Sequence, residues 1–121
     1  MKVLAIVSSA RKTGNSEILA KAMLAALPDS VEKQLLRLPD LAIEPCKACY
    51  ACLDKGASCI INDEFNELLR QVRQADAVIL ASPVYFLGMH TRLKLVCDRL
   101  ISVLNEAETY AGRRCVVAVP Y

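Results

Sequence analysis

Three short runs of apolar, mostly β-branched residues constrain this sequence most, because they carry no charge and are too short for helices. They are Val3 to Val7, Ala77 to Ala81 and Val116 to Val119. A strand with one solvated face carries polar residues at alternate positions, whereas a parallel strand that is covered on both faces is apolar throughout. We therefore expect these runs to be strands of a parallel sheet.

Helical spacing of apolar residues predicts the segments that connect the strands. The first helix would bury a stripe that consists of Ile18, Leu19, Ala22, Met23 and Ala26. Asn62 can cap a second helix, with Asp63 and Glu64 in its first turn, where carboxylates complement the helix dipole. The buried side of this second helix would consist of Phe65, Leu68, Leu69 and Val72.

A third helix can be capped by Thr91. Its apolar stripe would consist of Leu93, Cys97, Leu100, Ile101 and Leu104, which places Cys97 in the core. The run from Val31 to Leu38 is a weaker strand with no clean apolar face, and an edge position suits it. Strands that alternate with helices predict right-handed crossovers, and therefore a doubly wound α/β fold with helices on both sides of the sheet.

Composition narrows the class of protein. The 121 residues suffice for one domain, and 55% hydrophobic residues can form a real core. No uncharged apolar run approaches the roughly 18 residues of a membrane span. A net charge of +2 and 5% aromatic residues argue against nucleic-acid binding. The apolar start is too short for a signal peptide, so we expect a cytoplasmic protein.

The loop from Ser8 to Ser16 offers the groups that an anion site needs. In doubly wound sheets, ligands bind beyond the carboxyl ends of strands where the strand order reverses. This loop brings hydroxyls, an amide, a glycine and two cations to a helix N-terminus, which attracts phosphate. The G-x-G-x-x-G and P-loop patterns are both missing, which disfavours a nucleoside triphosphate. Alternatively, Asn15 or Ser16 only caps the helix, and Arg11 and Lys12 are solvated.

The loop from Ser82 to Gly88 is apolar and aromatic, and it follows the third predicted strand, after Ala81. Pro83 pre-sets the backbone, and Tyr85 or Phe86 can offer a π face to a flat ring. A phosphate site beside such a platform favours flavin mononucleotide (FMN) as the ligand. Alternatively, the aromatic residues only plug the end of the sheet or form a subunit contact.

Four of the six cysteines lie close together, at Cys46, Cys49, Cys52 and Cys59. Zinc sites more often use two separated C-x2-C pairs, whereas successive x2 spacings are typical of [4Fe–4S] ligation. The usual ferredoxin run has an x3 gap and a following proline, but here the gap is longer and the proline precedes the first cysteine. An iron–sulfur cluster is favoured, and free or redox-active thiols and zinc stay open as alternatives.

Four motifs cover nearly the whole chain in a specific order. They are Ser9-x-Arg11-x-x-Gly14-Asn15-Ser16, Pro45-Cys46-x-x-Cys49-x-x-Cys52, Ser82-Pro83-Val84-Tyr85-Phe86 and Leu93-Lys94-x-x-x-Asp98-Arg99. In this order and separation, the chain resembles the NADPH-dependent FMN reductase family, specifically its iron–sulfur flavoprotein branch. The resemblance implies a flavodoxin-like fold. It further implies that the FMN phosphate is held around Ser9, Arg11, Asn15 and Ser16, and that the isoalloxazine ring lies against Pro83, Val84, Tyr85 and Phe86.

The same resemblance implies that Cys46, Cys49, Cys52 and Cys59 ligate one [4Fe–4S] cluster near the flavin. It implies an FMN-dependent oxidoreductase that takes electrons from NAD(P)H or a ferredoxin-like donor and passes them to a small-molecule or protein acceptor, as a homodimer or homotetramer. One rival hypothesis is a non-enzymatic flavodoxin-type electron carrier, which the slightly basic charge disfavours. The second rival is a zinc-stabilised interaction module without flavin.

Other residues have plainer interpretations, and none is assigned to catalysis. His90, the only histidine, is expected to be a solvated loop residue. Asp98 and Arg99 are expected to be structural, as a helix-surface pair worth about 0.2–0.5 kcal/mol. Relatives continue into a third flavin loop, a further helix and a fifth strand. We therefore expect this sequence, which ends at Tyr121, to be truncated and to lack the last strand and helix of the fold.

Overall fold

Four parallel strands form the central sheet of the computed structural model, which describes residues 1–55, 58–103 and 114–118. The strand order is β2-β1-β3-β6, and the strands are β1 (Lys2–Val7), β2 (Glu32–Arg37), β3 (Ala77–Ala81) and β6 (Arg114–Ala118). This is the flavodoxin-like order, in which the chain reverses direction across the sheet between β1 and β3. The predicted doubly wound fold and the edge position of the weaker strand β2 are confirmed.

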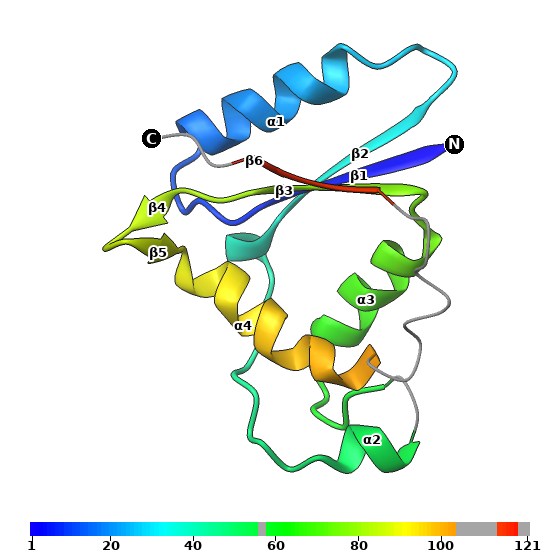
Figure 1. Ribbon diagram of the computed structural model, residues 1–121, viewed down its shortest axis with the longest axis vertical. Coiled ribbons are helices and arrows are strands. Elements are labelled where there is room, and N and C mark those ends of the chain that lie inside the picture. The colour runs from blue at the N-terminus through cyan, green and yellow to red at the C-terminus, as the bar shows by residue number, and fades with distance from the viewer. Residues whose placement is uncertain (56–57, 104–113, 119–121) are drawn as a thin grey trace.

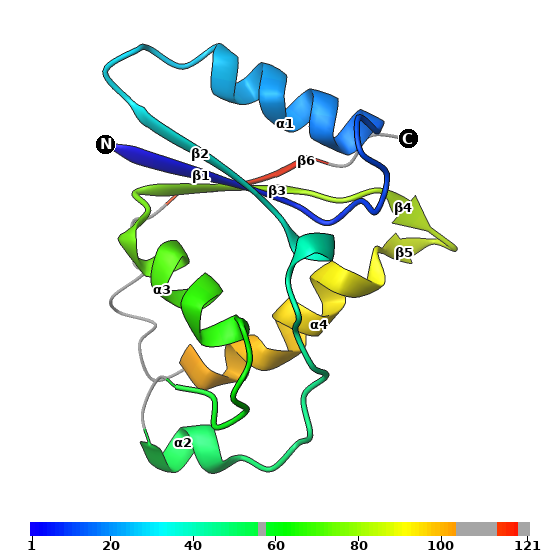
Figure 2. The same ribbon diagram turned by 180° about the vertical axis from the view of Figure 1, so that it is seen from behind.

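Helices cover both faces of this sheet. Figures 1 and 2 show α1 (Asn15–Ala25) on one face, and α3 (Phe65–Gln74) and α4 (Thr91–Arg99) on the other. Alternate residues of β1 point to opposite faces. One core cluster contains Val3, Ala5 and Val7 with Ala20 and Leu24 of α1, and the other contains Leu4 and Ile6 with Phe65, Leu68, Leu69, Leu93 and Val96. Burial on both faces explains why β1 is apolar throughout.

The connecting segments contain shorter elements that the sequence did not predict. A 3-10 turn, η1 (Leu38–Asp40), follows β2, and a short helix, α2 (Ala51–Lys55), lies inside the cysteine segment. A hairpin of β4 (Val84–Tyr85) and β5 (Gly88–Met89) follows β3. Each is too short to show a periodic pattern. Among the described residues, no helix combines the length and apolarity that crossing a membrane requires.

The predicted buried stripe of α1 is wrong. The helix instead buries a face that consists of Ser16, Glu17, Ala20 and Leu24. Ile18 is 56% exposed and Leu19 is 37% exposed. This face carries Glu17, which pairs with Arg37 at the end of β2, and packs Ala20 and Leu24 against the sheet. Helical spacing of apolar residues gives no signal for a buried face that includes a long-range ion pair.

Both predicted helix caps, Asn62 and Thr91, are wrong. The first N–H of α3 donates to Oδ1 of Asp63 at 3.1 Å, so that Asp63 precedes the helix and does not lie in its first turn. The Arg92 N–H of α4 donates to Nδ1 of His90 at 3.2 Å. Glu64 is the N-cap residue of α3 and makes no side-chain cap bond, whereas the His90 side chain caps α4.

The third helix ends earlier than its predicted stripe. The buried residues of α4 are Leu93, Val96 and Arg99, whereas Leu100 is 37% exposed. Leu104 lies outside the described residues. Cys97 is half-buried and packs against the core. Burial, followed by the neighbouring Asp98 charge, raises the pKa of the Cys97 thiol.

Candidate functional site

The loops after β1 and β3 begin side by side, at the point where the strand order reverses. Val7 pairs with Ala81, and the Ser8 N–H donates to the Ala81 carbonyl at 2.9 Å. Residues of both loops line one cavity with a volume of ≈ 610 Å³, called the loop cavity below. Its lining includes Ser9, Arg11, Asn15, Ser16, Pro83, Val84 and Tyr85. The structure thus brings together every residue predicted to contact flavin except Phe86.

A second, separate cavity is lined by the four clustered cysteines, has a volume of ≈ 340 Å³ and is called the cysteine cavity below.

Gly14 allows the first loop to close tightly. A Cβ atom at this position would lie 3.2 Å from Cβ of Arg11 and 3.4 Å from Oγ of Ser9. The Ser9 hydroxyl accepts a hydrogen bond from the Arg11 N–H at 3.3 Å. Gly14 is the N-cap of α1, so Asn15 and Ser16 lie inside the helix and not at its cap, as the alternative interpretation required. Glu17 and Ile18 donate their N–H groups to the Gly14 carbonyl, so only Asn15 and Ser16 of α1, which line the loop cavity, precede the first intrahelical bonds.

A buried ion pair that the sequence did not predict supports this loop. Arg37 of β2 pairs with Glu17 of α1 and also donates to the Ser9 carbonyl at 3.4 Å. Glu17 in turn accepts a hydrogen bond from the Thr13 N–H at 3.4 Å. The hydrogen bond from Lys21, helped by the Arg37 charge, lowers the pKa of Glu17 although burial opposes this. Two cations thus neutralise the carboxylate that lies behind the loop.

The second loop forms a two-residue hairpin turn. Its central residues, Phe86 and Leu87, have φ angles of 44° and 64°. Turns with positive φ at both positions normally contain Asn or Gly, so this turn is strained. Phe86 is fully exposed at the tip and does not line the loop cavity. Its predicted contact with flavin stays a prediction.

Ser82 and His90 hold the base of the hairpin. The Ser82 hydroxyl accepts a hydrogen bond from the His90 N–H at 3.1 Å. The Tyr85 and His90 rings meet edge to face, with centroids 5.1 Å apart. Burial, followed by the Arg92 charge, lowers the pKa of His90. His90 is therefore a half-buried helix cap and not the solvated loop residue that we expected.

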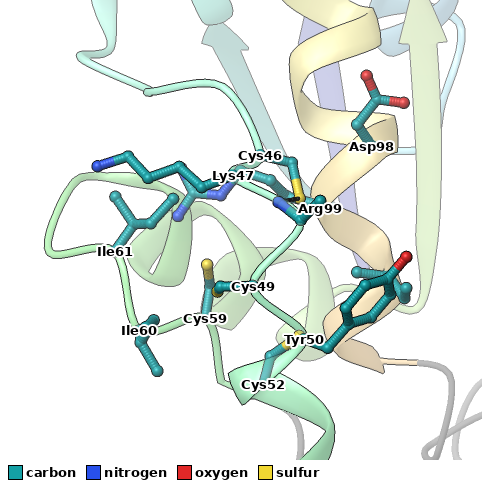
Figure 3. Close-up of a pocket in the computed structure, with 12 residues that line it drawn as sticks. Cys46, Lys47, Cys49, Tyr50, Cys52, Cys59, Ile60, Ile61, Asp98 and Arg99 are labelled. Carbon is teal, nitrogen blue, oxygen red and sulfur yellow. Dashed lines mark hydrogen bonds between the residues drawn. The ribbon is translucent and has the colours of Figure 1, made fainter.

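The four clustered cysteines line the cysteine cavity, whose volume is ≈ 340 Å³ (Figure 3). Cys46 and Cys49 are exposed, Cys59 is half-buried and Cys52 is buried, and all four are free thiols. Within the described ranges, no three Cys, His, Asp or Glu side chains are grouped closely enough to hold a metal ion. The sulfurs therefore share a cavity without forming a finished coordination shell.

Asp63, just before α3, and side chains of α3 and α4 hold both ends of the cysteine segment. Asp63 accepts a hydrogen bond from the Glu44 N–H at 2.8 Å, and Arg99 donates to the Glu44 carbonyl at 3.1 Å. The Asn66 amide makes two hydrogen bonds to the backbone of Cys59, at 3.2 and 2.8 Å. The segment is thus fixed before its first cysteine and at its last.

The predicted surface pair of Asp98 and Arg99 is wrong. Asp98 pairs with Lys94 on the exposed side of α4. Arg99 is only 1% exposed, donates to Asp63 at 2.9 Å and lies 4.2 Å from the centre of the Phe65 ring. Burial is the largest influence on the pKa of Asp63 and acts to raise it, but hydrogen bonds led by Arg99 outweigh it and lower the pKa. Sequence spacing gave no signal for this long-range pair.

The two cavities share no lining residue, and α4 lines only the cysteine cavity. Its first turn follows the hairpin, and its last turn contributes Asp98 and Arg99 to the cysteine cavity. A helix rises 1.5 Å per residue, so the nine residues of α4 span roughly 13 Å. Helix α4 therefore runs from the hairpin to the cysteine cavity.

A family model described as NADPH-dependent FMN reductase matches residues 1–119. The chain belongs to the NADPH-dependent FMN reductase family. One relative, an iron–sulfur flavoprotein of Methanocaldococcus jannaschii, is 38% identical over 100 residues, which are 82% of this chain and 51% of that protein. An iron–sulfur flavoprotein of Methanosarcina thermophila is 36% identical over 119 residues, covering 98% and 61%. This chain thus spans only part of the length of these relatives.

A solved structure has the same fold. The FMN-dependent NADH-azoreductase from Bacillus anthracis, determined in complex with FMN, superposes with a TM-score of 0.67 at 16% identity. The likeness covers 98% of this chain and 68% of the azoreductase. At 16% identity, this likeness shows that the chain has a flavodoxin-like fold, and it shows nothing about function.

Proposed function

We propose that this chain binds FMN and belongs to an FMN-dependent oxidoreductase of the NAD(P)H-dependent FMN reductase and iron–sulfur flavoprotein type. In this proposal, electrons pass between flavin, a [4Fe–4S] cluster and a small-molecule or protein acceptor. The observation that carries the proposal is the loop cavity, in which a helix N-terminus with polar side chains faces an aromatic hairpin. The family membership and the names of the relatives support it.

The residues of the loop cavity fit FMN in their chemistry. Ser9, Arg11, Asn15 and Ser16, with the first-turn N–H groups of α1, would hold the phosphate. Gly14 leaves space that a Cβ atom would fill. Pro83, Val84 and Tyr85 would lie against the ring, and Phe86 of the same hairpin is proposed as a further contact. Bound FMN would supply the redox chemistry, while the chain supplies position and electrostatics.

The residues of the cysteine cavity fit an iron–sulfur cluster. Thiolates are the ligands that such clusters prefer, and Cys46, Cys49, Cys52 and Cys59 line one space. Backbone strain supports a functional role, because φ is positive at Ala48 (51°) and Tyr50 (53°), on either side of Cys49. Metal sites often form only when the metal binds, which accounts for an open arrangement.

The proposal extends to the partners of the chain. NAD(P)H is the proposed electron donor because of the family, with a ferredoxin-like protein as the second class of donor. Exposed apolar side chains support assembly into dimers or tetramers, since such patches often mark association surfaces. These side chains are Ile18, Leu19, Phe86 and Leu87. A cytoplasmic location belongs to the same proposal.

Anaerobic purification with flavin, iron and sulfide analysis tests this function. We expect bound FMN, with iron and sulfide in equal amounts, and steady NAD(P)H oxidation when an acceptor is added. Cys49→Ser should lose iron but keep FMN, whereas Cys97→Ser, outside the cysteine cavity, should keep both. A colourless, zinc-containing protein would contradict the proposal. Bound cofactors without NAD(P)H oxidation would favour the electron-carrier hypothesis.

A further inference from the structure

Arg99 has a donor that the described part of the chain leaves unused. Its terminal nitrogens donate to Asp63 and to the Glu44 carbonyl. Its Nε atom is buried and has no hydrogen-bond partner among the described residues. An unpaired buried donor loses its hydrogen bonds to water without replacement, so it needs a physical explanation. A ligand in the adjoining cavity would provide one.

That cavity is the one that the cysteines line. Figure 3 shows Arg99 reaching from α4 to the cavity wall near Cys46, Cys49 and Cys59. A guanidinium stays protonated in proteins, so Arg99 keeps its positive charge beside Asp63. Arg99 and Cys59 line the same cavity, so this charge lies close to the thiol.

We propose that Arg99 is a positioning residue that donates an Nε–H hydrogen bond to the Cys59 sulfur and thereby raises the reduction potential of the bound cluster. The inference depends on the proposed function, because it requires the cluster. One-electron reduction adds one negative charge to the cluster and its thiolates, and no bond of Arg99 forms or breaks. Hydrogen bonds to sulfur and nearby positive charge stabilise that added charge.

A purely structural role makes a different prediction. Arg99 also anchors Asp63 and Glu44, so its loss could disturb the cysteine segment without any electrostatic effect on a cluster. Lys47 and Asp98 line the same cavity with opposite charges, so neither sign of charge dominates without Arg99. A reduction potential separates the two roles, because an anchor alone would change cluster content and not potential.

The test measures the midpoint potential of the cluster in the full chain, assembled without oxygen. Arg99→Gln, which removes both charge and Nε, should shift the reduction equilibrium about tenfold toward the oxidised form, or about 59 mV for one electron. Arg99→Lys keeps the charge and should shift it less, in the same direction. Lys94→Gln removes an exposed cation from the same helix and should leave the potential unchanged.

A second measurement needs no substitution and covers variants that fail to fold. In protein labelled with ¹⁵N-arginine, hyperfine spectroscopy of the reduced cluster should detect one coupled nitrogen. Fully loaded variants with the wild-type potential, or no coupled nitrogen, would overturn the role of Arg99 alone. Failure of the unchanged protein to bind iron and sulfide would overturn the proposed cluster, and this inference with it.

Discussion

The first loop and the cysteine segment are held in different ways. The first loop leaves a buried strand and is joined at once to the neighbouring strand, through the Ser8 N–H and the Ala81 carbonyl. The cysteine segment lies outside the sheet and is fixed at its ends by side chains of α3 and α4. The fold itself therefore positions the first site, whereas a few long-range polar contacts position the second.

Backbone strain is common to both regions. Among the described residues, positive φ angles at residues other than glycine occur only in the first loop, the cysteine segment and the hairpin. These residues are Thr13, Ala48, Tyr50, Phe86 and Leu87. Strain of this kind persists where surrounding structure enforces it, and it gathers at functional sites.

Asp63→Ala, which removes an anchor of the cysteine segment, should give the largest loss of stability. It leaves Arg99 buried without its carboxylate, which should lower the free energy of unfolding by about 3–5 kcal/mol. Urea denaturation at pH 7 measures this loss. Asp98→Ala, which breaks only the exposed pair with Lys94, should cost about 0.3–0.5 kcal/mol. Equal losses from the two variants would contradict the anchoring role of Asp63.

Acid should weaken the same anchor. The pKa of Asp63 lies below its usual value of 3.8 in the folded protein. The stability that Asp63 contributes is therefore present above its unfolded pKa of about 3.9 and is lost as pH falls through the lower folded value. Denaturation between pH 6 and 2 should show a steeper loss for the wild type than for Asp63→Asn. Parallel curves would contradict this.

Arg37→Met tests the support behind the first loop. Glu17 would keep Lys21 but lose its buried partner, so the free energy of unfolding should fall by about 2–3 kcal/mol. The Ser9 carbonyl also loses a donor, so FMN binding should weaken while iron content stays unchanged. Glu32→Ala, an exposed position on the same strand, is the control. If Arg37→Met lost iron but kept its affinity for FMN, Arg37 would support the cysteine segment and not the first loop.

Arg11→Ala addresses the ligand directly. Arg11 is exposed, so its removal should leave stability unchanged, but a lost charge-assisted hydrogen bond to phosphate should raise the Kd for FMN about tenfold. Fluorescence titration measures the Kd, and Arg70→Ala, an exposed arginine of α3 outside the loop cavity, serves as the control. An unchanged Kd in Arg11→Ala would reject a phosphate contact at this residue.

Substitutions in the hairpin turn should change the free energy of unfolding least. Replacing Phe86 and Leu87 together, as Phe86→Asn/Leu87→Gly, supplies residues that accept positive φ. Relief of strain should stabilise the protein by about 1 kcal/mol in urea denaturation. Destabilisation by the double variant would show that the two apolar side chains pack against a partner.

The sequence predicted the sheet because burial on two faces leaves uninterrupted apolar runs such as Val3 to Val7. It also predicted the residues of the loop cavity, since strand ends in a parallel sheet meet at one edge. It did not predict the α1 face, or the Arg99 pair with Asp63, because each depends on an ion pair between residues far apart in the chain. The spacing of residues within one helix does not indicate partners that lie far away in the chain.

Competition between FMN and riboflavin tests the central claim most directly. The two ligands share the isoalloxazine ring and differ in the phosphate, which the first loop is proposed to hold. Calorimetric titration of the oxygen-free protein should give much tighter binding of FMN than of riboflavin, and Arg11→Ala should reduce that preference. Equal affinity for both ligands, or no binding of FMN, would contradict the account.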